Sequence, residues 1–317
     1  MPNEVNTSLS RRHTREPLAG GPQKATDSAI CPPGAGRTKI GFVGLSAGAG
    51  ATTLAFAAAE YLAARPEKPA VSLLEIDMRP DAPAGRPYDK IGIDRRFAGR
   101  NFIPFYILAA EGKPLQGAGN IDGGISWALR VPGVPAPAPG LVTLHRLLNN
   151  ISGDIIVCDI SAPGILGSAR PPVGGYAAAG GYAAAGSYAA PAGYPAPASS
   201  PGGGLTAEAA GRAALLALLA DLDHAICIFD PLPSRLLAAV PAAETCRAAS
   251  ASGVPTTFVF NKLNAGVNLR EATRFTGVRD YIPFPAAPAE AIYAAEYACR
   301  SLAAEPGIKA ALAALFG

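Results

Sequence analysis

The sequence is poor in charged residues, and the charges it has are nearly balanced in sign. Only 16% of its 317 residues are Asp, Glu, Lys or Arg, and 27 basic residues against 24 acidic ones give a net charge of +3. This excess is too small to favour nucleic acid as a partner by charge alone. We interpret two short basic clusters as solvated surface charge. They are Arg11, Arg12 and Arg15, and Arg95, Arg96 and Arg100.

Cysteine is also scarce, and long apolar runs are absent. The five cysteines form no CxxC pair, and Cys158 and Cys227 lie in apolar, strand-like runs where cysteine behaves as a small hydrophobic residue. This usage favours a reducing compartment. No apolar run reaches the length of a membrane span, and no apolar segment follows the first arginines as in a signal peptide. We therefore expect a cytoplasmic protein.

Two segments lack the hydrophobic periodicity of a packed domain. Residues 1–36 are polar and rich in Pro and Gly, and residues 163–205 are almost entirely Gly, Ala, Pro, Ser and Tyr, with a tyrosine recurring every six residues. Neither segment can bury enough surface to offset its ordering entropy, so we expect a disordered tail and a disordered insert. Residues 37–162 and 206–317 then form the two parts of one α/β domain.

Apolar strands alternate with helices through these two parts. Strands are expected over 38–44, 70–77, 154–161, 224–230, 256–262 and 280–284. Helices are expected over 51–64, 103–111, 125–129, 141–151, 206–220, 232–250 and 287–316. The alternation predicts a mostly parallel sheet with helices on both faces. In such sheets, ligands bind at the carboxyl ends of the strands.

A glycine-rich loop, GLSAGAGATT over 44–53, joins the first strand to the first helix. Its glycines let successive N–H groups curl inward, and the helix N-terminus adds its positive end, which suits a di- or triphosphate. The expected contacts are Gly48, Ala49, Gly50, Ala51, Thr52 and Thr53. Thr52 stands where a hydroxyl would bind the nucleotide's Mg²⁺. The lysine that usually precedes this threonine is replaced by Ala51, which should weaken nucleotide binding by roughly 10- to 100-fold.

Two other interpretations of the loop stay open. The stretch 44–48 also matches G-x-S-x-G, the nucleophile elbow of α/β-hydrolases, in which Ser46 would attack. That fold needs a histidine late in the chain, whereas the last histidine here is His224. The second interpretation is a tight turn that binds nothing.

At these residues the chain resembles the ParA/MinD family of P-loop ATPases, in particular the pilus-assembly localisation proteins CpaE and TadZ. In the resemblance, the signature lysine of the family falls on Ser46 and the P-loop lysine on Ala51, while Gly48, Gly50, Thr52 and Thr53 match. The family has an aspartate motif near the attacking water. Here it reads IDMRP over 76–80, which keeps Asp77 as the candidate catalytic residue and has Arg79 in place of the second aspartate.

The resemblance implies further site residues and a cofactor, ATP or ADP with Mg²⁺. Asp159 would hold Mg²⁺ through water, in addition to Thr52. Asn261 resembles the asparagine that reads adenine, and Pro283 lies in the segment that lines the base pocket in the family.

The resulting expectation is a degenerate ParA/MinD-like protein that binds nucleotide weakly and acts as a switch or scaffold for partner proteins of a pilus or secretion apparatus. A homodimer is compatible with it. One alternative is a slow Mg²⁺-dependent ATPase. Another is a DNA-partitioning protein, which would need the Arg95 to Arg100 cluster to contact phosphates. The last segment, GIKAALAALFG over 307–317, is expected to be a helix that docks on the core in preference to a membrane, because Lys309 is its one basic residue.

Overall fold

The computed structural model describes residues 30, 36–78, 88, 92–97, 99–100, 102–115, 119–131, 140–161 and 207–317. Arg79, nearly all of the expected tail and the whole of the 163–205 insert lie outside the described residues.

An eight-stranded sheet forms the centre of the molecule, in the order β3-β4-β2-β5-β1-β6-β7-β8. Its strands are β1 (Thr38–Gly44), β2 (Val71–Asp77), β3 (Ile121–Asp122), β4 (Ile125–Ala128), β5 (Ile155–Ser161), β6 (His224–Phe229), β7 (Thr256–Leu263) and β8 (Ile282–Pro285). All neighbours pair in parallel except β3 and β4. The mostly parallel sheet that the sequence predicts is therefore confirmed.

Strand β1 lies in the middle of this sheet, between β5 and β6. Phe42 pairs with Asp159 on one side and with Ile226 on the other. From β1 the chain crosses through α1 (Ala51–Ala63) to β2 on the β5 side, whereas β6, β7 and β8 extend the opposite side. The loop after β1 thus lies at the point where the strand order reverses, which is where open parallel sheets bind ligands.

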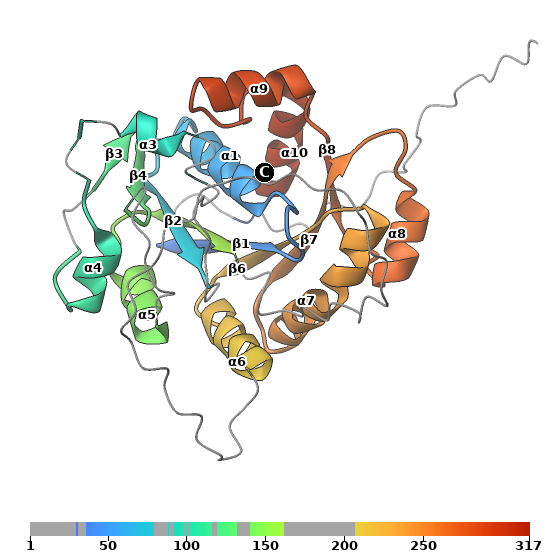
Figure 1. Ribbon diagram of the computed structural model, residues 1–317, viewed down its shortest axis with the longest axis horizontal. Helices are drawn as coiled ribbons and strands as arrows, with labels where there is room; N and C mark the ends of the chain where they lie inside the picture. Colours follow the sequence, from blue (N-terminus) through green and yellow to red (C-terminus); the bar gives the residue numbers. More distant parts are fainter. Residues whose placement is uncertain are drawn as a thin grey trace, which may run out of the picture.

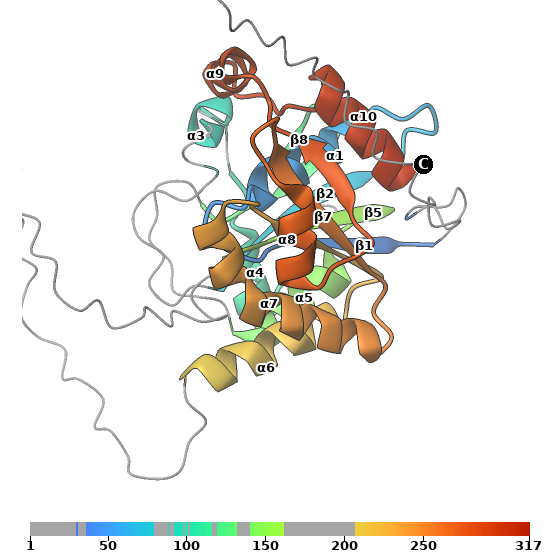
Figure 2. The same ribbon diagram turned by 90° about the vertical axis from the view of Figure 1, so that its right-hand side faces the viewer.

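Helices cover both faces of the sheet (Figure 1). Helix α1, α9 (Ala289–Tyr297) and α10 (Pro306–Phe316) lie on one side. The other side carries α4 (Phe105–Ala110), α5 (Leu141–Asn150), α6 (Ala207–Leu219), α7 (Pro233–Ala251) and α8 (Leu269–Thr276). The short α3 (Ile93–Arg96) lies near α9, as the rotated view in Figure 2 shows.

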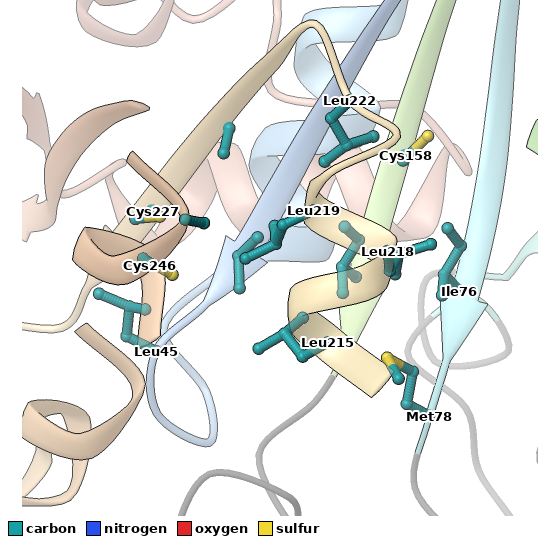
Figure 3. Close-up of a cluster of buried hydrophobic side chains, with 14 of the residues drawn as sticks. Leu45, Ile76, Met78, Cys158, Leu215, Leu218, Leu219, Leu222, Cys227 and Cys246 are labelled. Atoms are coloured by element: carbon teal, nitrogen blue, oxygen red, sulfur yellow. The ribbon is translucent and has the colours of Figure 1, made fainter. Parts of the chain in front are cut away.

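Each face has its own apolar core because side chains of a strand alternate between the two faces. Under α6, Leu215, Leu218 and Leu219 meet Ile76 and Cys158 of the sheet, and Figure 3 shows this packing. On the other face, Ile40 and Phe42 of β1 pack with α1 and α10. The cysteines at 158, 227 and 246 are buried and free, as expected of small core residues.

One expected element is wrong. Residues 125–129 were expected to be helical, but Ile125–Ala128 forms β4, which pairs in parallel with β2. Ile125 and Trp127 are buried and Ser126 is partly exposed between them, the alternation of a strand. The pairing with β2 outweighs the local preference of this short stretch.

The last helix docks on the core, as expected. In α10, Ile308, Leu312, Leu315 and Phe316 are all buried. Helix α10 contacts β8 and α1. Among the described residues, none of the helices combines the length and the apolar character needed to cross a bilayer.

His224 at the start of β6 makes stability depend on pH. Its Nε2 lies 2.8 Å from Thr257 Oγ1, and burial lowers the pKa of the ring from 6.5 to about 4. The unfolded chain therefore binds more protons between these values, so stability is full above pH 6.5 and falls as the pH drops towards 4.

We expect the loss of unfolding free energy between pH 7 and pH 4.5 to be about 2–3 kcal/mol smaller in His224→Gln than in the wild type. Urea unfolding of wild type and variant at pH 7 and pH 4.5 measures it, and His145→Gln serves as the control. A difference between wild type and His224→Gln that stays constant with pH would contradict the expectation.

Candidate functional site

The loop between β1 and α1 presents an open helix N-terminus. Gly50 is the N-cap residue of α1, with φ of 92°, and within the described part of the chain no side chain caps the helix. Gly48 also has a positive φ, of 75°, so the loop curls through two left-handed glycines. The first N–H groups of a helix have no intrahelical partner, so this end of α1 can accept an anion.

Two neighbouring side chains of β7 hold this loop through hydrogen bonds. Asn261 Nδ2 donates to the carbonyl oxygen of Ala49 at 2.9 Å, and Lys262 Nζ donates to that of Gly48. The approach is so close that a Cβ on Gly50 would lie 2.4 Å from Asn261 Nδ2. Only glycine fits at position 50.

The predicted loop residues are thus all together at the start of α1. Ala49 and Ala51 are buried, Thr52 is partly exposed and Thr53 is exposed. Ala51 is the first residue of the helix, and no cation replaces the missing lysine from within the loop. Whether these residues bind phosphate stays a prediction.

Ser46 has no geometry for a nucleophile. It is 5% exposed, and within the part of the chain that the structure describes its hydroxyl has no hydrogen-bond partner. A nucleophile elbow instead needs an exposed serine hydrogen-bonded to a histidine. The described histidines pair elsewhere, His145 with Asp221 and His224 with Thr257. The hydrolase interpretation therefore has no support in this geometry.

Three carboxylates lie side by side at the carboxyl ends of β2 and β5. Glu75 pairs in register with Asp159, and Asp77 follows two residues later on the same face. Their exposed fractions are 3% for Glu75 and 1% for both Asp77 and Asp159. This is the face of the sheet that α1 covers, since Leu73 and Val157 on the same face belong to its core. The structure thus brings Asp77 and Asp159 together on adjacent strands.

A buried arginine accompanies these carboxylates. Arg130 follows β4, and its Nη1 lies 3.7 Å from Asp77 Oδ2, with both side chains 2% exposed. Its backbone N–H donates to Glu75 Oε2 at 3.0 Å. Its guanidinium also lies over the ring of Tyr106, 5.7 Å from the centroid. Asp77 is therefore held in a buried ion pair.

Burial and the carboxylates of this cluster raise the pKa values of two nearby tyrosines. Burial, and then the negative charges of Asp159 and Glu75, raise the pKa of Tyr88 well above its usual value. Burial, and then the charge of Glu75, also raise the pKa of Tyr106. Both phenols stay protonated, so they are neutral neighbours of the carboxylates.

A cavity of about 130 Å³ opens beside the loop, between α1, β7 and α9. Its polar lining comes from Thr53, Asn261 and Lys262 next to Gly50, and from three residues at and after the end of α9, Glu296, Arg300 and Ser301. Its apolar side includes Leu54, Phe56, Pro285, Ile292 and Ile308.

The structure brings Asn261, but not Pro283, to this cavity. Pro283 is exposed in β8, and Pro285 lines the cavity instead. A register shift between Phe260 and Leu263 separates the positions at which β7 pairs with the two prolines. Base recognition by Asn261 stays a prediction.

The Arg95 to Arg100 cluster is largely engaged within the fold. Arg96 pairs with Glu60 at 3.3 Å and with Asp122, and it lies 4.8 Å over the ring of Trp127. Arg100 pairs with Asp122 at 3.1 Å. Phosphate contacts by Arg96 would have to break its ion pairs, which weighs against the DNA-partitioning alternative, whereas Arg95 is exposed and the Arg100 side chain is 53% exposed.

Three contributors to the site have weak signals in the sequence. Glu75 is a charged residue inside an apolar strand, which is unusual enough to be noticed. Arg130 ends a short apolar run, and Lys262 follows the asparagine that was singled out. Their partners are far apart in the sequence, so only the fold reveals what they contact.

No family model and no curated protein matches the sequence. Solved structures do match the fold. The "ParA Family ATPase from Chlorobium tepidum TLS" is 15% identical, with 88% of this chain and 98% of that chain covered and a TM-score of 0.53.

Two structures of MinD match this chain about as well. The septum site-determining protein MinD of Pyrococcus horikoshii OT3, complexed with Mg-ADP, is 14% identical over 88% of this chain and 94% of its own, with a TM-score of 0.54. The MinC:MinD cell division protein complex of Aquifex aeolicus matches at 12% identity, 88% and 93% coverage and a TM-score of 0.54. The chain therefore has the P-loop NTPase fold of the ParA/MinD ATPases.

Proposed function

We propose that this protein is a degenerate ParA/MinD-like switch or scaffold that binds an adenine nucleotide with Mg²⁺ weakly and positions partner proteins. The observation that carries the proposal is the uncapped N-terminus of α1 behind a glycine loop, at the strand-order reversal, with Ala51 in place of lysine. The likeness to the CpaE and TadZ pilus proteins, and a cytoplasmic location, are part of the same proposal.

The loop fits a phosphate group on its own geometry. Nothing lies within 4 Å of the point where a Cβ on Gly48 would stand, so there is space on that side of the loop. The open N–H groups at the start of α1 supply donors and the positive end of the helix dipole. The apolar cavity next to Asn261 would accept the base.

The protein side chains alone do not form a binding site for Mg²⁺. In the part of the chain that the structure describes, His, Cys, Asp and Glu side chains do not gather in threes around a common metal position. Mg²⁺ would therefore be held through the nucleotide, the Thr52 hydroxyl and waters near Asp159.

The chain's own residues favour holding nucleotide over hydrolysing it. A bound nucleotide with Mg²⁺ supplies a phosphoryl group that water can attack. Asp77 is the residue expected near that water, but its carboxylate is paired with Arg130 inside the protein. Ala51 leaves the loop without a lysine to offset charge on the transferred group. Both features argue for slow turnover at most.

The partner part of the proposal rests on the comparisons. One similar structure is a complex of MinD with MinC. Partner binding by this chain, possible homodimerisation, and a pilus or secretion apparatus as its setting are inferences from that likeness and from the sequence resemblance.

Calorimetric titration of ATP, with and without Mg²⁺, tests the nucleotide site. We expect binding that requires Mg²⁺, and we expect Thr52→Ala to weaken it about tenfold or more because a metal-linked hydroxyl is lost. Thr273→Ala in α8 is the matched control, since its hydroxyl contacts only the helix carbonyl of Arg270 at 3.0 Å. Absence of binding at millimolar ATP would contradict the proposed nucleotide site. Only the scaffold part of the proposal, the positioning of partner proteins, would then remain.

A further inference from the structure

A short chain of contacts ties the phosphate loop to the ends of β6 and β7. Lys262 Nζ, at the end of β7, donates both to the carbonyl oxygen of Gly48 and to Asp230 Oδ2, the latter at 3.1 Å. Asp230 follows β6, its side chain is 4% exposed, and its Oδ1 accepts from the N–H of Leu232 at 3.2 Å. One ammonium group therefore joins the loop to a buried, fixed carboxylate.

We propose that Lys262 is the positioning cation of this loop, which holds it in the phosphate-ready shape without the lysine missing at position 51. The inference rests on the proposed nucleotide site and names a residue that serves it. Among the described residues, no other lysine or arginine side chain has a hydrogen bond to residues 44–53.

The direction of the contact explains how it acts. Lys262 and Asn261 take two consecutive carbonyl oxygens, those of Gly48 and Ala49. A peptide group whose C=O is fixed outward has its N–H fixed on the opposite side, because the peptide is planar. Holding the Ala49 carbonyl therefore keeps the N–H of Gly50 on the side away from Asn261, where an anion would meet it. The N–H opposite the Gly48 carbonyl is that of Ala49, which is bonded to Ser46 O at 3.1 Å, so Lys262 supports the turn that this bond closes.

The backbone at Lys262 is left-handed, at the register shift of β7 against β8 between Phe260 and Leu263. Its φ is 60°, in the left-handed region that residues with a Cβ rarely adopt. Such a conformation persists where surrounding contacts determine it. Lys68, with φ of 47°, has the same kind of backbone in the exposed turn after α1 and is far from the loop in sequence. It offers a matched control for the effect of replacing a left-handed lysine.

Hydrogen exchange of the peptide covering 44–54 tests the proposal without any ligand. Its reporters are the N–H of Ala49, bonded to Ser46 O at 3.1 Å, and the N–H of Leu54, bonded to Gly50 O at 3.0 Å. Lys262→Met should raise exchange in this peptide by about tenfold, whereas Lys262→Arg should retain most of the protection. Lys68→Met should leave it unchanged. Lys262→Met leaves the carboxylate of Asp230 buried without its partner. If this single variant does not fold, the same exchange measurement is made on the double variant Lys262→Met, Asp230→Asn, in which that carboxylate is neutral.

Titration with Mg²⁺·ADP adds the functional readout. The Lys262→Met variant should bind about tenfold more weakly, and Lys262→Arg should restore the affinity. Unchanged exchange in the 44–54 peptide overturns the proposal, whatever happens to affinity. If Lys262→Met raises exchange in this peptide but the wild-type protein binds no Mg²⁺·ADP, Lys262 remains the positioning residue and the nucleotide function is refuted instead.

Discussion

Replacing Ala51 with lysine is expected to strengthen Mg²⁺·ATP binding by about 10- to 100-fold. Ala51 is the first residue of α1, directly after the left-handed Gly50, so a long side chain there starts at the mouth of the loop. A charge-assisted hydrogen bond to a phosphate contributes about 1.5–3 kcal/mol, which gives the expected range. Calorimetry on wild type and Ala51→Lys under identical salt measures it.

The control for this gain is Ala51→Met, which adds length without charge. Ala51 is 8% exposed, so a longer side chain perturbs packing in both variants to a similar degree. A gain seen with lysine but not with methionine, and reduced at high salt, identifies the charge as the cause. Equal affinities of all three proteins would mean that position 51 does not face the phosphates, and the proposed site would have to be abandoned.

The strand and the helix on either side of the loop could be predicted from the sequence. Strand β1 and helix α1 were expected at 38–44 and 51–64, and they lie at Thr38–Gly44 and Ala51–Ala63. Both follow from local signals, an apolar run that stops at glycines and an alanine-rich segment that ends before Pro66. Local signals of this kind do not depend on which strands pair.

The parts that could not be predicted depend on register between distant strands. Asp77 and Arg130 meet because β4 pairs with β2, and β4 itself was expected to be helical. Lys262 meets Gly48 across 214 positions of sequence. Pro285 lines the cavity and Pro283 does not, and the pairing of β7 with β8 shifts register between Phe260 and Leu263. A one-dimensional pattern does not specify these registers.

The Arg130–Asp77 pair should matter more for stability than any exposed ion pair of the described residues. Arg130→Met is expected to lower the free energy of unfolding by about 3–5 kcal/mol, since it leaves buried carboxylates without their cation. Urea unfolding measures the change. Lys113→Met, which breaks the exposed pair of Lys113 with Glu111 at 2.7 Å, should cost at most about 1 kcal/mol.

The double variant Arg130→Met, Asp77→Asn separates a lost charge pair from lost packing. If the cost comes from an unpaired carboxylate, then neutralising Asp77 should recover a large part of it, because replacing both partners of a buried pair costs far less than removing one. If the double variant is as unstable as Arg130→Met alone, the loss comes from the contact of the Arg130 guanidinium with the Tyr106 ring instead, since the backbone N–H that bonds Glu75 is kept in both variants. Recovery would also mean that Asp77 is held for structure, which is consistent with a protein that binds nucleotide and turns it over slowly.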